Sequence, residues 1–297
     1  MVSTRLVELN TADGLTIAGA IFEPKKRTKT IIIWIPGLAN TFHGGLSNTH
    51  VLANRLATHK ISLSIFNTRG SHIVSFLKKQ RGKSTKRIPL GVAFERFTDS
   101  AFDVAAMVHT VRKLGYSKIF ILGSSTGANK LAYSGWRGAL RGVSGGIMLG
   151  PISDIPSIRH DYGAKLDKIL KHADNLVRRG KGNELLPASL VGSAIWGAAR
   201  FISIALPKTR EDTFPYYDFK RPFYWVKRWR IPLLVLLGSK DQYLDRPAKE
   251  VMDTFNKQCA QLKRYQSLIF HGADHKFDLH RKELADILAK WIHHLGV

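Results

Sequence analysis

Short, continuously apolar runs alternate with amphipathic stretches along most of the chain. The apolar runs that predict buried strands are Thr30–Ile35, Ile61–Phe66, Lys118–Leu122, Gly146–Leu149, Pro232–Leu237 and Ser267–Phe270. The stretches whose apolar residues have helical spacing are Leu46–Leu56, Phe94–Leu114, Ala248–Phe255 and Leu279–Leu295. Two runs of alternating polarity, Leu6–Leu9 and Leu15–Phe22, predict an N-terminal hairpin. Strands that alternate with helices predict an α/β fold with a doubly wound, mostly parallel sheet.

This alternation is interrupted before the strand predicted at Pro232–Leu237. The interruption consists of a predicted helix at Asp161–Arg179, an apolar stretch at Ala188–Leu206 and a mixed aromatic and basic segment at Thr213–Arg230. We predict that residues 152–228 form a mainly helical lid on a core made of residues 1–151 and 229–297. Residues 71–92 are polar and basic, and no core pattern explains them. They predict a long loop.

The run Gly123-Ser124-Ser125-Thr126-Gly127 follows one predicted strand and precedes a predicted helix that begins near Ala128. It fits the pattern G-x-S-x-G, and strand, tight turn and helix are the context that a nucleophile elbow requires. A serine at the tip of such a turn projects its hydroxyl group away from the sheet. Glycines on both sides avoid collisions with neighbouring backbone and tolerate unusual dihedral angles. Ser125 is therefore the predicted nucleophile.

A serine nucleophile needs a general base, and the base needs a carboxylate that orients it. Asp241 and His275 each follow a predicted strand, and with Ser125 they stand in the order nucleophile, acid, base. Active sites of such sheets lie beyond the carboxyl ends of the strands, so we expect these three side chains to assemble at that edge. Asp154, in the loop after the next predicted strand, is the alternative acid.

The backbone and the lid supply the other candidate residues. An oxyanion hole needs two N–H donors. Thr126 at the start of the elbow helix is one, and Leu38 in the turn after Thr30–Ile35 is the other, with Ala39 as its alternative. From the apolar part of the predicted lid, we expect Trp196 or Phe201 to line the substrate pocket.

These motifs together resemble the α/β-hydrolase superfamily, and the resemblance covers most of the chain. Besides the elbow, it rests on the turn Pro36-Gly37-Leu38 and on the loops Gly238–Asp241 and Gly272–His275. Two further runs, Gly150–Asp154 and Gly180–Pro187, are similar to a narrower family that includes fungal siderophore esterases of the fusarinine-hydrolysing kind. The resemblance implies a serine hydrolase. Ser124 departs from it, because histidine is common before the nucleophile of hydrolase elbows.

Charge adds one unusual property. The chain has 46 Lys and Arg residues against 22 Asp and Glu residues, a formal net charge of +24 at pH 7. Local clusters lie at Lys25–Lys29, Lys78–Arg87 and Lys220–Arg230. Such a charge suits an anionic substrate or surface, whereas no zinc-finger spacing, RNP-like motif or basic heptad indicates a nucleic-acid-binding module. A generally solvated basic surface is the alternative interpretation.

Compartment and cofactors follow from smaller features. The single Cys259 excludes an internal disulfide, the N-terminal residues lack the apolar region of a secretory signal, and Arg200 interrupts the longest apolar stretch. We therefore expect a cytoplasmic protein. Because the sequence shows no metal-ligand cluster and no phosphate-binding glycine loop, we expect no metal and no cofactor.

The sequence thus favours an enzyme that cleaves a carboxylic ester of a small molecule through an acyl-enzyme on Ser125. The alternative function is binding. In that case the chain would be a weakly catalytic or non-catalytic protein of the same fold, and its basic surface would bind an anionic polymer or a membrane.

Overall fold

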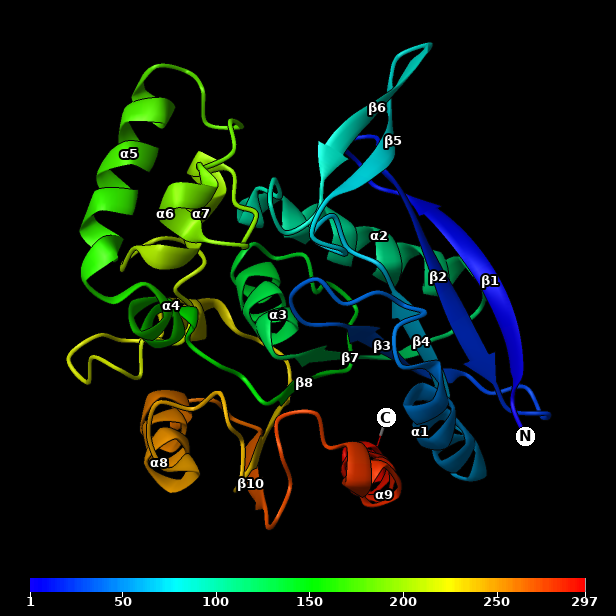
Figure 1. Ribbon diagram of the computed structural model, residues 1–297. Coiled ribbons are helices and arrows are strands. Elements are labelled where there is room, and N and C mark those ends of the chain that lie inside the picture. Colours follow the sequence, from blue (N-terminus) through cyan, green and yellow to red (C-terminus); the bar gives the residue numbers. More distant parts are fainter. Residues whose placement is uncertain (297) are drawn as a thin grey trace.

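An eight-stranded sheet forms the centre of the molecule (Figure 1). The structure is a computed structural model that describes residues 1–296. Across the sheet the strands are β1 (Ser3–Asn10), β2 (Thr16–Glu23), β4 (Ser62–Phe66), β3 (Thr30–Ile35), β7 (Lys118–Ser124), β8 (Gly145–Leu149), β9 (Leu233–Gly238) and β10 (Tyr265–Phe270). The strands from β4 to β10 pair in parallel, and β1 and β2 form the predicted hairpin at one edge. The predicted fold class is confirmed.

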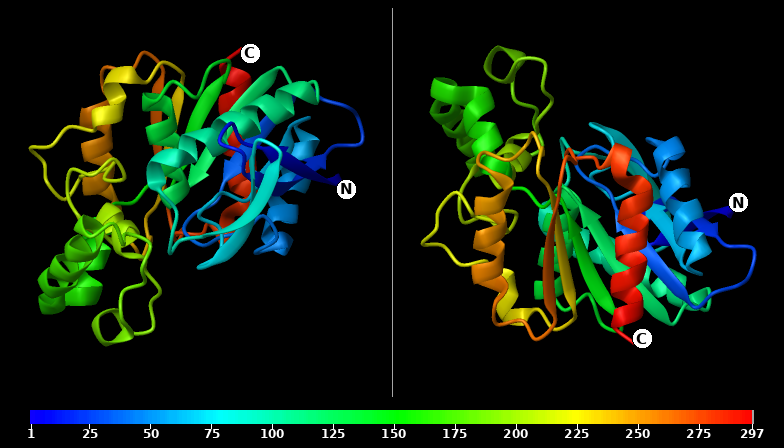
Figure 2. Two further views of the ribbon diagram at one scale, coloured as in Figure 1. Left: turned by 90° about the horizontal axis from the view of Figure 1, so that it is seen from above. Right: turned by 90° about the horizontal axis from the view of Figure 1, so that it is seen from below.

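The inner strands are continuously apolar because helices cover both faces of the sheet. One face packs against α2 (Ser100–Lys113), α3 (Thr126–Trp136) and α8 (Ala248–Cys259), and the other against α1 (Leu46–Thr58) and α9 (Arg281–His294) (Figure 2). In β3, Ile31 and Ile33 belong to the apolar core on the face covered by α2, α3 and α8, whereas Ile32 belongs to the core on the face covered by α1 and α9. Within residues 1–296, no helix is long and apolar enough to cross a membrane.

Between β8 and β9 the chain leaves the sheet and forms a separate group of helices. They are α4 (Asp154–Tyr162), α5 (Leu166–Arg178), α6 (Ala188–Val191) and α7 (Ala198–Ala205). The single helix predicted over Asp161–Arg179 is wrong at its start, because the chain turns at Gly163 with φ of +46° and divides it into α4 and α5. These helices have their own apolar core. Phe214 and Trp225, later in the segment, pack instead into the core between the sheet and helices α2, α3 and α8.

Buried charges fasten this helical group to the sheet domain. Arg200 of α7 forms ion pairs with Glu211 and with Glu95, and Glu95 accepts a 2.8 Å hydrogen bond from Lys130 Nζ of α3. All four side chains are almost completely buried. Removing one member of such a network leaves a buried charge unpaired, so the network fixes α7 relative to the sheet.

The prediction of a long loop over residues 71–92 is wrong. Most of it is a second, two-stranded antiparallel sheet, with β5 (Ser75–Arg81) paired to β6 (Ser84–Leu90) through a tight turn at Gly82 and Lys83. This hairpin projects from the body of the molecule (Figure 1). The β1–β2 turn contacts it near its tip, where the N–H of Gln80 donates a 2.8 Å hydrogen bond to the carbonyl of Gly14.

Candidate active site

Ser125 lies at the tip of a strained turn between β7 and α3. Its φ of +54° and ψ of −129° are rare for a residue with a side chain, and its N–H donates a 2.9 Å hydrogen bond to the carbonyl of Leu149. A Cβ atom on Gly123 would collide with the carbonyl oxygen of Gly127, and one on Gly127 would collide with that of Ile35. The close packing around the turn therefore requires both glycines and holds the serine in place.

Asp241 and His275 form a hydrogen-bonded pair beyond the ends of β9 and β10. His275 Nδ1 lies 2.8 Å from Asp241 Oδ2, and the aspartate side chain has no exposed surface. Its second oxygen, Oδ1, accepts a 3.0 Å hydrogen bond from the N–H of Tyr243. The ring of Tyr243 also packs edge-on against the imidazole, with ring centroids 4.7 Å apart. These contacts fix the orientation of the imidazole through Nδ1 and through the ring itself. Its other nitrogen, Nε2, is not part of the contact with Asp241.

A pocket of about 570 Å³ brings the elbow and the imidazole together. Among the predicted site residues, those that line it are Leu38, Ser125, Thr126, Asp154, Trp196 and His275. Asp241 lies behind His275 and reaches the pocket through it. The volume falls within the range of small-molecule sites. The pocket can therefore hold a substrate against the hydroxyl group of Ser125.

The two predicted oxyanion-hole donors border the same pocket. Thr126 is the first residue of α3, so its N–H has no acceptor inside the helix. The turn that carries Leu38 approaches Ser125 closely, since a Cβ atom on Gly37 would lie 2.8 Å from Cβ of Ser125. Within residues 1–296, the N–H of Leu38 has no hydrogen-bond partner.

Asp154, the alternative acid, lines the pocket from the first turn of α4. The pKa of its carboxyl group is raised to about 7, mainly by burial and also by the nearby carboxylates of Glu211, Asp212 and Glu95, while Arg200 acts to lower it. In the described part of the chain it makes no hydrogen bond to His275. The geometry therefore joins the imidazole to Asp241 and leaves Asp154 as a separate acidic group.

The two aromatic residues predicted for the pocket have different positions. Trp196 lines it and donates a 2.9 Å hydrogen bond to the hydroxyl of Tyr162. Phe201 is fully buried in the core of the helical group, against Tyr162 and Trp196, and does not reach the pocket wall. On α7, Ile204 lines the pocket whereas Phe201 does not, and the sequence pattern does not reveal which apolar residue of this helix faces the pocket.

Several residues that contribute to the site were not predicted from the sequence. The indole of Trp34 donates a 2.8 Å hydrogen bond to Ser124 Oγ, so the serine at the unusual elbow position has a buried partner on β3. Arg281 lies over the Trp34 ring and also lines the pocket. These contacts join residues far apart in sequence, and no local signal indicates them. Tyr243 could have been suspected, because it follows Asp241 in the same exit loop.

Comparisons with solved structures identify the fold as that of α/β-hydrolases. The siderophore hydrolase EstB from Aspergillus fumigatus is 16% identical, with a TM-score of 0.71 over 98% of each chain. Est1E from Butyrivibrio proteoclasticus, solved with ferulic acid, is 16% identical, with a TM-score of 0.65 over 97% of this chain and 99% of its own. A thermostable carboxyl esterase from Bacillus coagulans is 17% identical, with a TM-score of 0.60 over 100% of both chains.

The comparisons of sequence are more limited. No curated protein matches the chain. A family model described as "Protein of unknown function (DUF1749)" matches residues 96–295, a range that holds Ser125, Asp241 and His275. Since this match spans well over half of the sequence, the chain belongs to the DUF1749 family, and it has the α/β-hydrolase fold.

Proposed function

We propose that the protein is a serine hydrolase that cleaves carboxylic esters through an acyl-enzyme on Ser125. The observation that carries the proposal is the 2.8 Å contact of His275 with a fully buried Asp241, beside a pocket that Ser125 enters from a nucleophile elbow. The esterase neighbours named above support the same reaction class.

In the proposed mechanism, Ser125 attacks the ester carbonyl while His275 Nε2 removes the hydroxyl proton. Asp241 holds the imidazole with its proton on Nδ1 and stabilises the imidazolium that forms. His275 then gives the proton to the departing alcohol. Water, activated by the same imidazole, releases the acid from Ser125.

The N–H groups of Leu38 and Thr126 would stabilise the oxyanion of both tetrahedral intermediates. Each donor of this kind contributes roughly 10²- to 10³-fold to kcat in serine hydrolases. Thr126 adds the positive end of the α3 dipole. The unpartnered N–H of Leu38 supports its role, because an unused donor beside the nucleophile is available to the substrate.

We further propose that residues 152–228 act as a lid that selects the substrate. Trp196 and Ile158 contribute an apolar wall, and Asp154 and Asp161 add carboxyl groups on the same side. A pocket of about 570 Å³ suits a bulky ester. The siderophore hydrolase and the ferulic acid complex among the neighbours are consistent with such substrates.

Trapping of the covalent intermediate tests the reaction. The protein is mixed with a slowly deacylating aryl ester, quenched in acid and digested, and the masses of its peptides are measured by mass spectrometry. The proposal predicts an acyl adduct on the peptide that contains Ser125. Ester turnover with an adduct on another residue, or with none, would contradict it.

A non-catalytic binding protein remains the second candidate, because a cluster of cations on the β5–β6 hairpin lies outside the pocket. Absence of turnover on every ester tested, together with ligand binding that Ser125→Ala leaves unchanged, would favour that function.

A further inference from the structure

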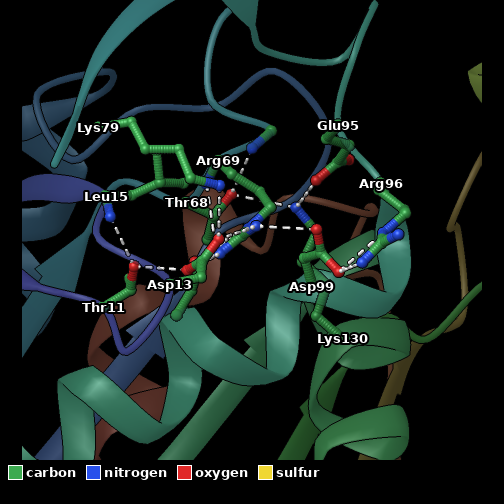
Figure 3. Close-up of polar contacts among 12 residues, drawn as sticks. Thr11, Asp13, Leu15, Thr68, Arg69, Lys79, Glu95, Arg96, Asp99 and Lys130 are labelled. Carbon is green, nitrogen blue, oxygen red and sulfur yellow. Dashed lines mark hydrogen bonds and ion pairs between the residues drawn. The ribbon is translucent and has the colours of Figure 1, made fainter. Parts of the chain in front are cut away.

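The β5–β6 hairpin carries a concentration of positive charge that the active site does not use. Six cationic side chains lie within residues 75–90, and residues 71–94 contain no acidic residue; the cations are Lys78, Lys79, Arg81, Lys83, Lys86 and Arg87. Within residues 1–296, their one acidic partner is Asp13, which lies 3.4 Å from Lys79 and is shared with Arg69 (Figure 3). The positive charge of the hairpin is therefore almost uncompensated.

The strand register places like charges opposite one another. Lys78 pairs with Arg87, and Lys79 pairs with Lys86 on the other face. Directly opposed like charges destabilise an antiparallel pair, and a lone two-stranded hairpin has little stability to spare. The repulsion is relieved when an anionic surface supplies counter-charge. Lys79 has Asp13 as a partner, but within residues 1–296 no ion pair compensates Lys78, Lys86 or Arg87.

Exposed apolar side chains adjoin these cations. Ile73 is 47% exposed, Val74 is 38% exposed and Phe76 is 62% exposed. Phe76 lies two residues from Lys78 on the strand, so that both side chains are on the same face of the ribbon. On the opposite face, the side chain of Lys79 reaches Asp13 in the β1–β2 turn, and its backbone forms an isolated antiparallel bridge with Leu15.

From these observations we infer that the hairpin docks on an anionic lipid bilayer. Lys78, Arg87 and their neighbours would lie among the anionic headgroups, and Phe76, Ile73 and Val74 would enter the interface. A nucleic acid would neutralise the cations equally well, but it would leave three apolar side chains without a role. The membrane accounts for both features.

The base of the hairpin adjoins the pocket. The N–H of His72 bonds to the carbonyl of Ala39, next to Leu38. The carbonyl of Ile73 accepts a bond from Ala93, whose own carbonyl accepts one from Gly197, next to Trp196. The docking surface therefore begins at the segment that supports two walls of the pocket.

Vesicle binding of the full-length protein tests this inference without any need for catalysis. Co-flotation is measured with phosphatidylcholine vesicles and with vesicles in which about one third of the lipid is phosphatidylserine, at roughly 0.05 M salt. The variant Lys78→Gln with Arg87→Gln is compared with Lys257→Gln and Lys290→Gln. These two exposed cations lie on α8 and α9, remote from the hairpin (Figure 1).

We expect binding to the anionic vesicles only. The hairpin variant should lose on the order of 30-fold in partition coefficient, and the control about threefold at most. Phe76→Ser should weaken binding and leave its salt dependence unchanged, and Ser125→Ala should bind as the wild type does. Thermal unfolding should show the hairpin variant to be at least as stable as the wild type, because a repulsive pair is removed.

Equal losses in the hairpin and control variants would overturn the inference, because the net charge alone would then explain binding. Absence of binding to anionic vesicles would also overturn it. If a DNA duplex were bound instead, and that binding depended on Lys78 and Arg87, the hairpin would be assigned to nucleic acid.

Discussion

Nδ1 of His275 and Oδ2 of Asp241 lie 2.8 Å apart, next to a glycine that leaves room for both groups. A Cβ atom on Gly150 would lie 3.2 Å from Nδ1 and 3.5 Å from Oδ2. The backbone after β8 thus packs directly on the pair formed by the loops after β9 and β10. The proposed acid–base pair depends on three strand ends, which is how a parallel sheet assembles a site from distant residues.

The pair makes a prediction about the two candidate acids. Asp241→Asn should lower kcat by on the order of 10⁴-fold, because the amide favours the wrong imidazole tautomer and cannot stabilise the imidazolium. Asp154→Asn, which leaves the pair intact, should change kcat by less than about tenfold. Steady-state kinetics on one aryl ester compare them. The reverse ranking would assign the role of the acid to Asp154.

Gly150 provides a test that leaves the reacting groups in place. Gly150→Ala should lower kcat roughly 10- to 100-fold by displacing His275, whereas thermal stability should fall only slightly. The matched control is Gly180→Ala, since Gly180 has a similarly positive φ of +75° but no atom near its Cβ position. Equal effects of the two variants on kcat would show that backbone strain, and not the contact with His275, is responsible.

Asp154 should make stability depend on pH. Its carboxyl group has a pKa of about 7 in the folded protein and 3.8 as its ordinary value. Between these two values the folded state binds the proton more tightly than the unfolded state does. Its contribution to stability is therefore complete below about pH 4 and is lost as the pH rises through about 7.

Asp154→Asn removes this dependence. The free energy of unfolding should rise by roughly 4 kcal/mol at about pH 8, and it should change little at about pH 4. Urea denaturation of both proteins at the two pH values measures it. A variant that is less stable than the wild type at the higher pH would contradict the assigned pKa.

Trp196 and Phe201 should respond differently to truncation. Trp196→Ala enlarges the pocket and should change relative kcat/KM across a series of esters of increasing size, by roughly 10- to 200-fold at the extremes. Phe201→Ala creates a cavity in the core of the helical group and should cost about 3–5 kcal/mol of stability, with the wild-type order of preference kept. A changed order in the Phe201 variant alone would reverse their roles.

The sequence predicts much of the fold because buried parallel strands carry an unmistakable local pattern. Thr30–Ile35 is apolar on both faces, and it forms β3 over the predicted residues. The same pattern does not predict the β5–β6 hairpin, because cations occupy both of its faces and its strands show no alternation of apolar and polar residues. Gly163 likewise ends a helix within a continuous amphipathic pattern.

The site is predictable only where one short motif contains the information. The glycines around Ser125 indicate the elbow, because that backbone excludes other residues. The choice between Asp241 and Asp154 depends instead on which loop approaches His275, and the wall position of Trp196 depends on how α7 packs. Both are tertiary relationships, as is the bond from Trp34 to Ser124.

Labelling by a fluorophosphonate probe tests the central proposal most directly, since the probe phosphonylates only an activated serine. The wild type and Ser125→Ala are incubated with the probe, and their circular dichroism spectra verify that both are folded. We predict stoichiometric labelling of the wild type at Ser125, and neither labelling nor ester turnover in the variant, since loss of the nucleophile lowers kcat by about 10⁶-fold. A folded Ser125→Ala protein that is labelled and hydrolyses esters at the wild-type rate would contradict the proposed function.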